Sequence, residues 1–242
     1  SFTATASNLN VGGNVSSLNN IAVNVNLTSE AGANIDSANG NIDINGSIAG
    51  ASLGLNANTT SGTVNVDAVG GTGDFTVTAK DINVDGTITK TGNTSLTGNA
   101  LTGTVRLDAV SGANDLSANA NNISLGGDVT TNGNVNLTAV TKTTLENSTT
   151  INTSANNKDI SVNGTLDANT NNLTLNAGTG NIDVDNITNL AALNIVAKDL
   201  TAGLSNLTAT GDIYVDANTI LTSNSVINAA NIDFVKNITG GD

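Results

Sequence analysis

GTVNVDAV, residues 62–69, is followed 41 residues later by GTVRLDAV, residues 103–110. The same offset relates further pairs of residues: Asp74 and Asp115, Ile82 and Ile123, Gly86 and Gly127. A fixed period of this length marks stacked units, none of which can bury its apolar face alone. The repeat therefore predicts a long, regular object rather than a globule built around a cleft.

Short runs of alternating apolar and polar residues fill most of the chain. Such alternation is typical of strands with one buried face, and Gly, Asn or Asp bounds most of the runs. Examples are NIDIN at 41–45, TVNVD at 63–67, DINVD at 81–85, NVNLT at 134–138, DISVN at 159–163, NLTLN at 172–176, NIDVD at 181–185 and DIYVD at 212–216. No helical periodicity is sustained, so the chain is predicted to be all-β.

The spacing of corresponding runs gives the length of one coil. Their first apolar residues, 22, 18, 23 and 18 residues apart, are Ile42, Val64, Ile82, Val105 and Ile123. The period thus contains two coils of about 20 residues, each with room for three short strands. We predict a right-handed parallel β-helix of about 12 coils, forming a single repeat domain over residues 1–242. Coils stacked at the ~4.8 Å strand spacing give a rod roughly 55–60 Å long.

The alternation also predicts which side chains point inward. Within one coil they are Phe75 and Val77 on one strand, Ile82 and Val84 on the next, and Ile88 at the start of a third. Asn at equivalent corners of successive coils is expected to form hydrogen-bonded side-chain ladders.

The later coils are less regular. The series of coil markers is expected to continue through Ile160, Ile182, Leu200 and Tyr214. Residues 145–155 fit the pattern worst, and we interpret them as an insertion or an irregular coil.

Composition argues against several classes of protein. The chain carries 20 acidic and 7 basic residues, a net charge of −13, whereas nucleic acids and anionic membrane surfaces attract clustered cations. No apolar run approaches the ~20 residues of a membrane span. The absence of Cys excludes disulfides and thiol chemistry. Disorder is the remaining alternative, but disordered chains are usually rich in Pro and poor in β-branched residues, and this chain has no Pro.

Three runs resemble the repeats of filamentous-haemagglutinin-like proteins, the large exoproteins of bacterial two-partner secretion: GNIDINGSI at 40–48, NGTLDA at 163–168 and GNIDVD at 180–185. The resemblance covers nearly the whole chain. It implies a right-handed β-helix, an extracellular location, an adhesive or scaffolding role, and an outer-membrane transporter as the partner for secretion. The Asn-Pro-Asn-Gly-type motif of that family's secretion domain requires Pro, so this chain resembles the repeat shaft.

β-Helical enzymes that act on polysaccharides form the competing class. Polygalacturonase-like sites combine an Asp cluster with His, which this chain lacks. Pectate-lyase-like sites resemble an Arg base beside Ca²⁺ held by Asp. Arg106 is the single Arg, and its counterpart one period earlier is Asn65. Because the alternation points Arg106 outward, we interpret it as a solvated surface charge.

Paired carboxylates are the other candidates for chemistry. Asp183 and Asp185 flank one inward Val and would share a face, and Asp81 and Asp85 form a second pair. Such pairs can assist acid/base catalysis or bind Ca²⁺. On a soluble rod, outward Asp residues that serve solubility are the better interpretation.

GGTGDF at 70–75 begins like a Ca²⁺-binding nonapeptide, but Phe75 stands where that repeat needs Asp. We therefore predict no catalytic, cofactor-binding or metal-binding residues.

Two surface motifs remain. Asn-x-Ser/Thr acceptors, which license surface exposure at most, include Asn26, Asn93, Asn136 and Asn206. The triplets at 76–78 and 87–89 read Thr-x-Thr, as in ice-binding solenoids. One period later these positions hold Ser117-Ala-Asn119 and Asp128-Val-Thr130, so the array is interpreted as broken.

These observations predict a structural and adhesive shaft of a secreted bacterial surface fibre, without enzymatic activity, nucleic-acid binding or membrane insertion. Its expected partner is a glycan or protein on a host or neighbouring cell. A second version is a subunit that stacks end to end into a filament, since both termini alternate like coil sequence. A polysaccharide-active enzyme, or a carbohydrate-binding or ice-binding module, is the alternative from another class.

Overall fold

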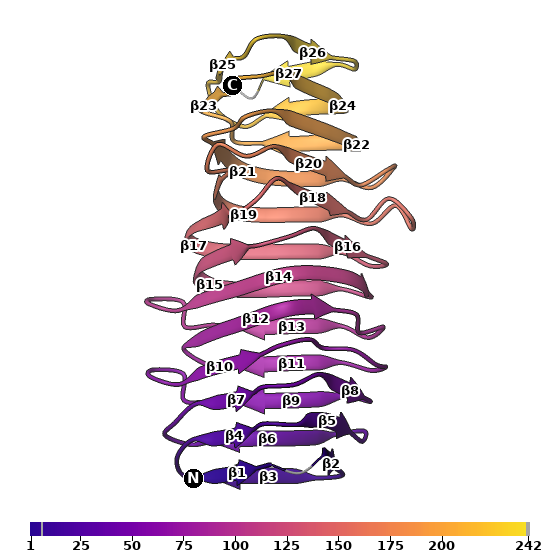
Figure 1. Cartoon of the computed structure of the whole chain (residues 1–242). Coiled ribbons are helices and arrows are strands. Elements are labelled where there is room, and N and C mark those ends of the chain that lie inside the picture. Colours follow the sequence, from indigo (N-terminus) through magenta and orange to yellow (C-terminus); the bar gives the residue numbers. More distant parts are fainter. Residues whose placement is uncertain (6, 241–242) are drawn as a thin grey trace.

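The computed structural model describes residues 1–5 and 7–240, which form a parallel β-solenoid of about 12 turns, about 20 residues apart. These residues contain strands and turns but no helix, and thus no helical segment that could cross a membrane. Figure 1 shows the strands stacked along a rod with the termini at opposite ends. The predicted all-β parallel solenoid is confirmed.

The turns contribute strands to three faces, which we call A, B and C in chain order; in the turn of β10 (Thr63–Val66), face B is represented by the isolated bridges of Val69 alone. Long strands bend around a corner and belong to two faces, which is why most strands merge into one 22-stranded sheet.

Face A begins each turn. Its strands are β1 (Phe2–Ala4), β4 (Ile21–Val23), β7 (Ile42–Ile44), β10 (Thr63–Val66), the first parts of β12 (Asp81–Ile88) and β14 (Thr104–Ala113), the last parts of β15 (Leu116–Leu125), β17 (Val135–Leu145), β19 (Ile160–Asp167) and β21 (Ile182–Thr188), then β23 (Asn206–Thr208) and β25 (Val226–Asn228).

Face B follows. It contains β2 (Asn8–Val11), β5 (Asn26–Ser29), β8 (Ile48–Gly50), the last parts of β12 and β14, β16 (Val129–Thr131), β18 (Thr149–Asn152), β20 (Leu173–Asn176), the first parts of β22 (Leu193–Ala202) and β24 (Ile213–Leu221), and β26 (Ile232–Phe234).

Face C closes each turn. It contains β3 (Asn14–Ser17), β6 (Ala33–Ser37), β9 (Leu53–Asn56), β11 (Phe75–Thr78), β13 (Thr94–Thr97), the first parts of β15, β17, β19 and β21, the last parts of β22 and β24, and β27 (Ile238–Gly240).

Aliphatic columns run along the interior. Ile42 pairs with Val64, Val64 with Ile82, Ile82 with Val105, and Val105 with Ile123, as the sequence spacing predicts. The five inward residues predicted within one coil, Phe75 to Ile88, are all buried. Since each buried Val, Leu or Ile contributes roughly 1.5–3 kcal/mol, these columns are the main source of the rod's stability.

The predicted later markers are corrected by the register. The next residue above Ile123 is Thr143, a buried polar residue that the search for apolar markers could not find. Ile160, Ile182 and Leu200 do stack on one another, but on face C. Tyr214 is an outward residue of face B, paired with Asn194, so its assignment as a marker was wrong.

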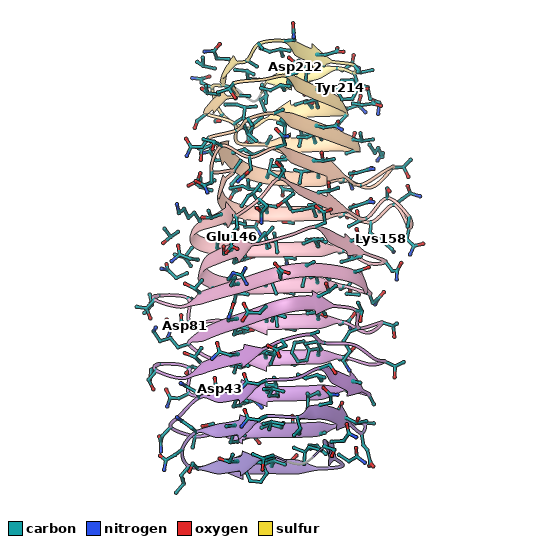
Figure 2. The ribbon with its side chains drawn as sticks, viewed as in Figure 1. Asp43, Asp81, Glu146, Lys158, Asp212 and Tyr214 are labelled. Carbon is teal, nitrogen blue, oxygen red and sulfur yellow. The ribbon has the colours of Figure 1, made fainter. Side chains whose placement is uncertain are left out.

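The irregular region is narrower than predicted. Within residues 145–155, Leu145 and Ile151 are buried in β17 and β18, so the coil itself is regular. The extra residues lie in the turn that follows β18, where Asn157 has a positive φ of 52°. Figure 2 shows Lys158, in the same turn, projecting from the side of the rod.

Candidate functional site

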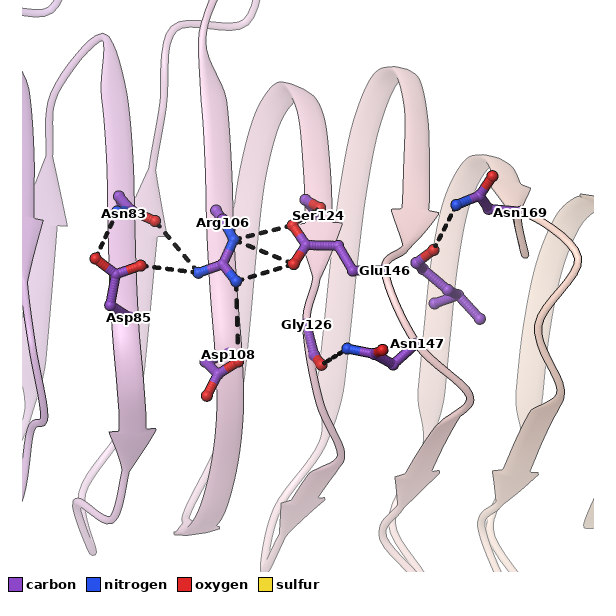
Figure 3. Close-up of polar contacts among 10 residues, drawn as sticks. Asn83, Asp85, Arg106, Asp108, Ser124, Gly126, Glu146, Asn147 and Asn169 are labelled. Carbon is purple, nitrogen blue, oxygen red and sulfur yellow. Dashed lines mark hydrogen bonds and ion pairs between the residues drawn. The ribbon is translucent and has the colours of Figure 1, made fainter.

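Arg106 lies on the outward side of β14 and belongs to a network across several turns (Figure 3). Its guanidinium donates hydrogen bonds of 2.9 and 2.9 Å to the carboxylate of Glu146 and one of 3.0 Å to Asp85. Asp108 lies 3.9 Å from Nη2, and Ser124 donates a 2.7 Å hydrogen bond to Glu146. Arg106 does point outward as predicted, but it connects side chains of different turns instead of standing free in solvent.

Gly126 makes this bridge possible. Arg106 and Glu146 come from turns that are separated by one turn, and Gly126 lies between them on face A. A Cβ at this position would stand 3.1 Å from Arg106 Nη2, 3.1 Å from Glu146 Oε2 and 2.8 Å from Asp108 Oδ1. A side chain here would therefore push the ion pair apart.

The network fixes the charge of its members. The hydrogen bond from Arg106 holds the pKa of Glu146 below its usual range, and the reciprocal bond raises the pKa of Arg106. A raised pKa makes Arg106 a poor general base, which is the role that a pectate-lyase-like site would require of it. The geometry suits the linking of turns better than proton transfer.

The paired carboxylates lie apart from this network, except for Asp85. Asp183 and Asp185 share face C, as predicted, and both are exposed. Asp185 accepts a 2.7 Å hydrogen bond from the backbone N–H of Gly164. Asp81 accepts one of 2.9 Å from the N–H of Thr104 and pairs with Lys80. Each of these contacts ties one turn to the next or neutralises a neighbouring charge.

The GGTGDF stretch forms the corner between faces B and C. Phe75 is buried in the core, while Asp74 accepts a 2.9 Å hydrogen bond from the N–H of Asn93. Among the described residues, no three His, Cys, Asp or Glu side chains gather in a group that could hold a metal ion.

A ladder of side chains climbs the corner before face C. At each level the side-chain oxygen accepts the backbone N–H of the equivalent residue one turn later, at 2.7–3.3 Å. Its members are Asp74, Asn93, Asp115, Asn134, Asp159 and Asn181. A ladder is present at this corner as predicted, but its bonds join side chains to backbone N–H groups instead of Asn side chains to one another, and Asp alternates with Asn. This alternation keeps like charges from stacking at the strand spacing, which gives the two-turn period a chemical reason.

Lys90 was missed by the sequence reasoning. It follows Ile88 by two residues at the corner between faces B and C, and it is fully buried. Its ammonium donates to the carbonyls of Gly50 and Thr72 at 3.2 and 3.1 Å and also to that of Ala51. The side chain thus reaches back across two turns. Burial lowers the pKa of Lys90, and the nearby Asp74 carboxylate opposes this shift.

The glycines at the positions equivalent to Lys90 were a sequence signal that this site is unusual. Equivalent residues on neighbouring turns, two after each inward residue of face B, are Gly50, Gly71 and Gly112. All three have positive φ, and a Cβ on Gly71 would stand 2.2 Å from the carbonyl oxygen of Gly50. Lys90 replaces this glycine at a position that the alternation places inward.

Lys236, near the C-terminal end of the described residues, resembles Lys90 in part, but it is exposed and forms a 2.9 Å ion pair with the carboxylate of Asp216. It follows Phe234 by two residues, and its ammonium donates to the carbonyls of Ala197 and Asp216 at 3.2 and 3.4 Å. It too reaches back across two turns.

The Thr-x-Thr array on face C is broken as predicted, although the outward positions of the next turns stay polar. Thr76-Val-Thr78 is followed on the next turn by Ser95-Leu-Thr97 and only then by Ser117-Ala-Asn119. Comparison one full period ahead had skipped the intermediate turn. The second triplet, at 87–89, lies on face B and takes no part in this array.

Three of the four Asn-x-Ser/Thr acceptor residues named above are exposed on the surface. Asn26, Asn93 and Asn136 are exposed, while the side chain of Asn206 lies outside the described residues.

Two hollows indent the rod near its N-terminal end. The larger, about 660 Å³, lies along the ends of β3, β6 and β9 and includes the exposed Leu18. The smaller, about 330 Å³, lies on face C above Gly54.

Comparison of the chain with known protein families, with curated proteins and with solved structures finds no match.

Proposed function

We propose that this chain is a stiff shaft segment of a bacterial cell-surface fibre, which holds adhesive elements away from the cell. The observation that carries the proposal is the corner ladder from Asp74 to Asn181, in which each turn is tied to the next by a side chain as well as by strand pairing. Hydrogen bonds of both kinds run along the rod axis and resist its extension and bending. Polar side chains that link each turn to the next in this way favour a mechanical role.

Two further features support a shaft. The Arg106 and Lys90 contacts each span two turns and add links that strand pairing alone does not provide. The resemblance of the coil sequences to filamentous-haemagglutinin-like repeats supports an extracellular location, with export through an outer-membrane transporter. The enzyme alternative loses support because the guanidinium of Arg106, its candidate base, is engaged by the carboxylates of Glu146 and Asp85.

Immunogold electron microscopy of intact cells of the source organism, with an antibody against this chain, tests the proposal. We expect gold particles outside the outer membrane, at a distance set by the fibre, and their loss after brief protease treatment of intact cells. Label confined to the cell interior, or label that persists until the cells are lysed, contradicts a surface shaft. An antibody against a periplasmic protein controls for the integrity of the cells.

A further inference from the structure

The middle of face C presents ten outward side chains without a charge. They form two columns, one of Thr76, Ser95, Ser117, Asn136 and Ser161, the other of Thr78, Thr97, Asn119, Thr138 and Asn163. The chain as a whole has a net charge of −13, and face A at the same levels carries the Arg106 network. The two columns of face C are therefore neutral hydroxyl and amide side chains on an acidic molecule. They are bordered along one edge by the ladder carboxylates Asp74, Asp115 and Asp159. At the C-terminal end they are followed by Asp183 and Asp185.

Most of these side chains have unused hydrogen-bonding capacity. Asn163 bonds to Thr138 at 3.2 Å, and two weaker bonds join Thr138 to Asn136 and Ser161 to Asn163. Within the described residues, the other six side chains, from Thr76 to Asn119, make no hydrogen bond. They offer donors and acceptors at a regular spacing along the rod.

A hollow continues the array toward the N-terminal end. Gly54 stands in the same column as Thr76, and the side chain of Asn34 from the previous turn lies against it, since a Cβ at residue 54 would stand 2.2 Å from Asn34 Oδ1. The hollow measures about 330 Å³, at the lower end of the range of small-molecule sites. Its polar lining is Asn34, Ser52, Asn56, Asp74 and Thr76. Asp74 uses one carboxylate oxygen for the ladder, which leaves the other for a ligand hydroxyl.

We propose that face C binds a neutral polysaccharide, with one sugar ring in the hollow above Gly54 and the following sugars along the two columns. Sugar hydroxyls complement Ser, Thr and Asn, which both donate and accept hydrogen bonds. The net charge of the chain repels an acidic glycan. Each contact is weak, and affinity comes from many equivalent contacts along the rod.

An ice surface is the other flat ligand that a hydroxyl array could take. The observations favour the glycan because the columns mix Ser, Thr and Asn, because the hollow interrupts the plane, and because the last two levels bond to each other. The inference rests on the proposed surface location, where such a glycan would be met.

Pull-down and titration of the purified 242-residue chain with neutral polysaccharides (cellulose, chitin, mannan) and acidic ones (alginate, hyaluronan) test this inference. The face C variant is Thr76→Ala/Ser95→Ala/Ser117→Ala. The matched control removes three outward hydroxyls from face B at nearby levels, as Thr89→Ala/Ser111→Ala/Thr130→Ala. A third variant, Gly54→Asn, adds a side chain to the hollow and displaces the amide of Asn34 that lines it. Circular dichroism establishes that all variants remain folded.

We expect binding to at least one neutral polysaccharide, a loss of about tenfold or more in the face C variant, a clear loss in Gly54→Asn, and no change in the face B control. Failure to bind any neutral polysaccharide, preference for the acidic ones, or equal losses on both faces overturns the inference. Thermal hysteresis that only the face C variant loses would instead assign the face to ice. Because binding is measured on purified protein, a negative result leaves the microscopy test of the shaft untouched, and the reverse also holds.

Discussion

Lys90 and Arg106 are cations on neighbouring turns of one rod, and they are stabilised in opposite ways. Lys90 points inward, is fully buried, and meets only backbone carbonyls. Arg106 points outward, with a side chain that is 31% exposed, and meets the carboxylates of Asp85 and Glu146. Both reach across two turns. The difference teaches that a cation on an inward position in the middle of the rod finds backbone carbonyls, whereas one on an outward position finds carboxylates of neighbouring turns.

Replacement of Lys90 by Ala is expected to have the largest effect on stability. Loss of the buried aliphatic stem leaves a cavity, which typically costs about 2–4 kcal/mol. Lys90→Met keeps most of the stem and is expected to lie within about 1 kcal/mol of the native protein, because Gly50 and Ala51 have other hydrogen-bond donors. Urea denaturation midpoints of the three proteins measure this. Equal losses in both variants would show that the ammonium, and not the stem, matters at this corner.

The pH dependence of the same proteins tests the burial of the charge. The folded state lowers the pKa of Lys90, so the unfolded chain binds this proton more tightly. Stability is therefore expected to rise as the pH increases from the folded pKa toward the normal value of about 10.4. Lys90→Met lacks this rise. Parallel midpoints for the two proteins up to pH 10 would contradict the assignment.

Replacement of Arg106 is expected to cost less, about 1 kcal/mol, because its ion pairs are partly exposed. Arg106→Met keeps the stem, and Lys158→Met is the control, since Lys158 makes no ion pair among the described residues. The lowered pKa of Glu146 means that its contribution is present at neutral pH and is lost as the pH falls through the folded pKa. The gap between native protein and Arg106→Met should therefore close below about pH 4.3. A gap that persists at pH 2 would point to packing instead.

Gly126→Ala tests whether the missing side chain at residue 126 leaves the room that the Arg106–Glu146 bridge needs. We expect a loss below about 1 kcal/mol, because the added Cβ displaces flexible side-chain ends rather than backbone. In the Arg106→Met background the same substitution should cost nearly nothing. A double-mutant cycle from denaturation midpoints measures the coupling, and additive losses would separate Gly126 from the bridge.

The sequence predicted what depends on local alternation and missed what depends on register. The column from Ile42 to Ile123 follows from spacing alone, because each member is apolar and bounded by similar turns. Its continuation failed at Thr143, where a polar residue takes an inward place. The partner of Arg106 could not be found, since Glu146 is 40 residues away and the bridge needs the gap above Gly126.

Lys90 and face C were within reach of the sequence. Alternation through Thr87, Ile88 and Thr89 already places Lys90 inward, where a charged residue is a strong signal. The two polar columns of face C were overlooked because comparison at the full 41-residue period passes over every second turn. Sequence comparison at the coil spacing of about 20 residues would have aligned Thr76, Ser95 and Ser117.

The smallest effect is expected for one of two outward serines of the same strand, β15. Ser124 faces outward on face A and donates a 2.7 Å hydrogen bond to Glu146, so Ser124→Ala should cost about 1 kcal/mol. Ser117 faces outward on face C and has no hydrogen-bond partner within the described residues, so Ser117→Ala should change stability by less than about 0.5 kcal/mol. The same chemical change on the same strand thus distinguishes a face that links turns from a face left open to a ligand. A loss of stability for Ser117→Ala as large as that for Ser124→Ala, measured by denaturation midpoint, would mean that the hydroxyls of face C also stabilise the fold.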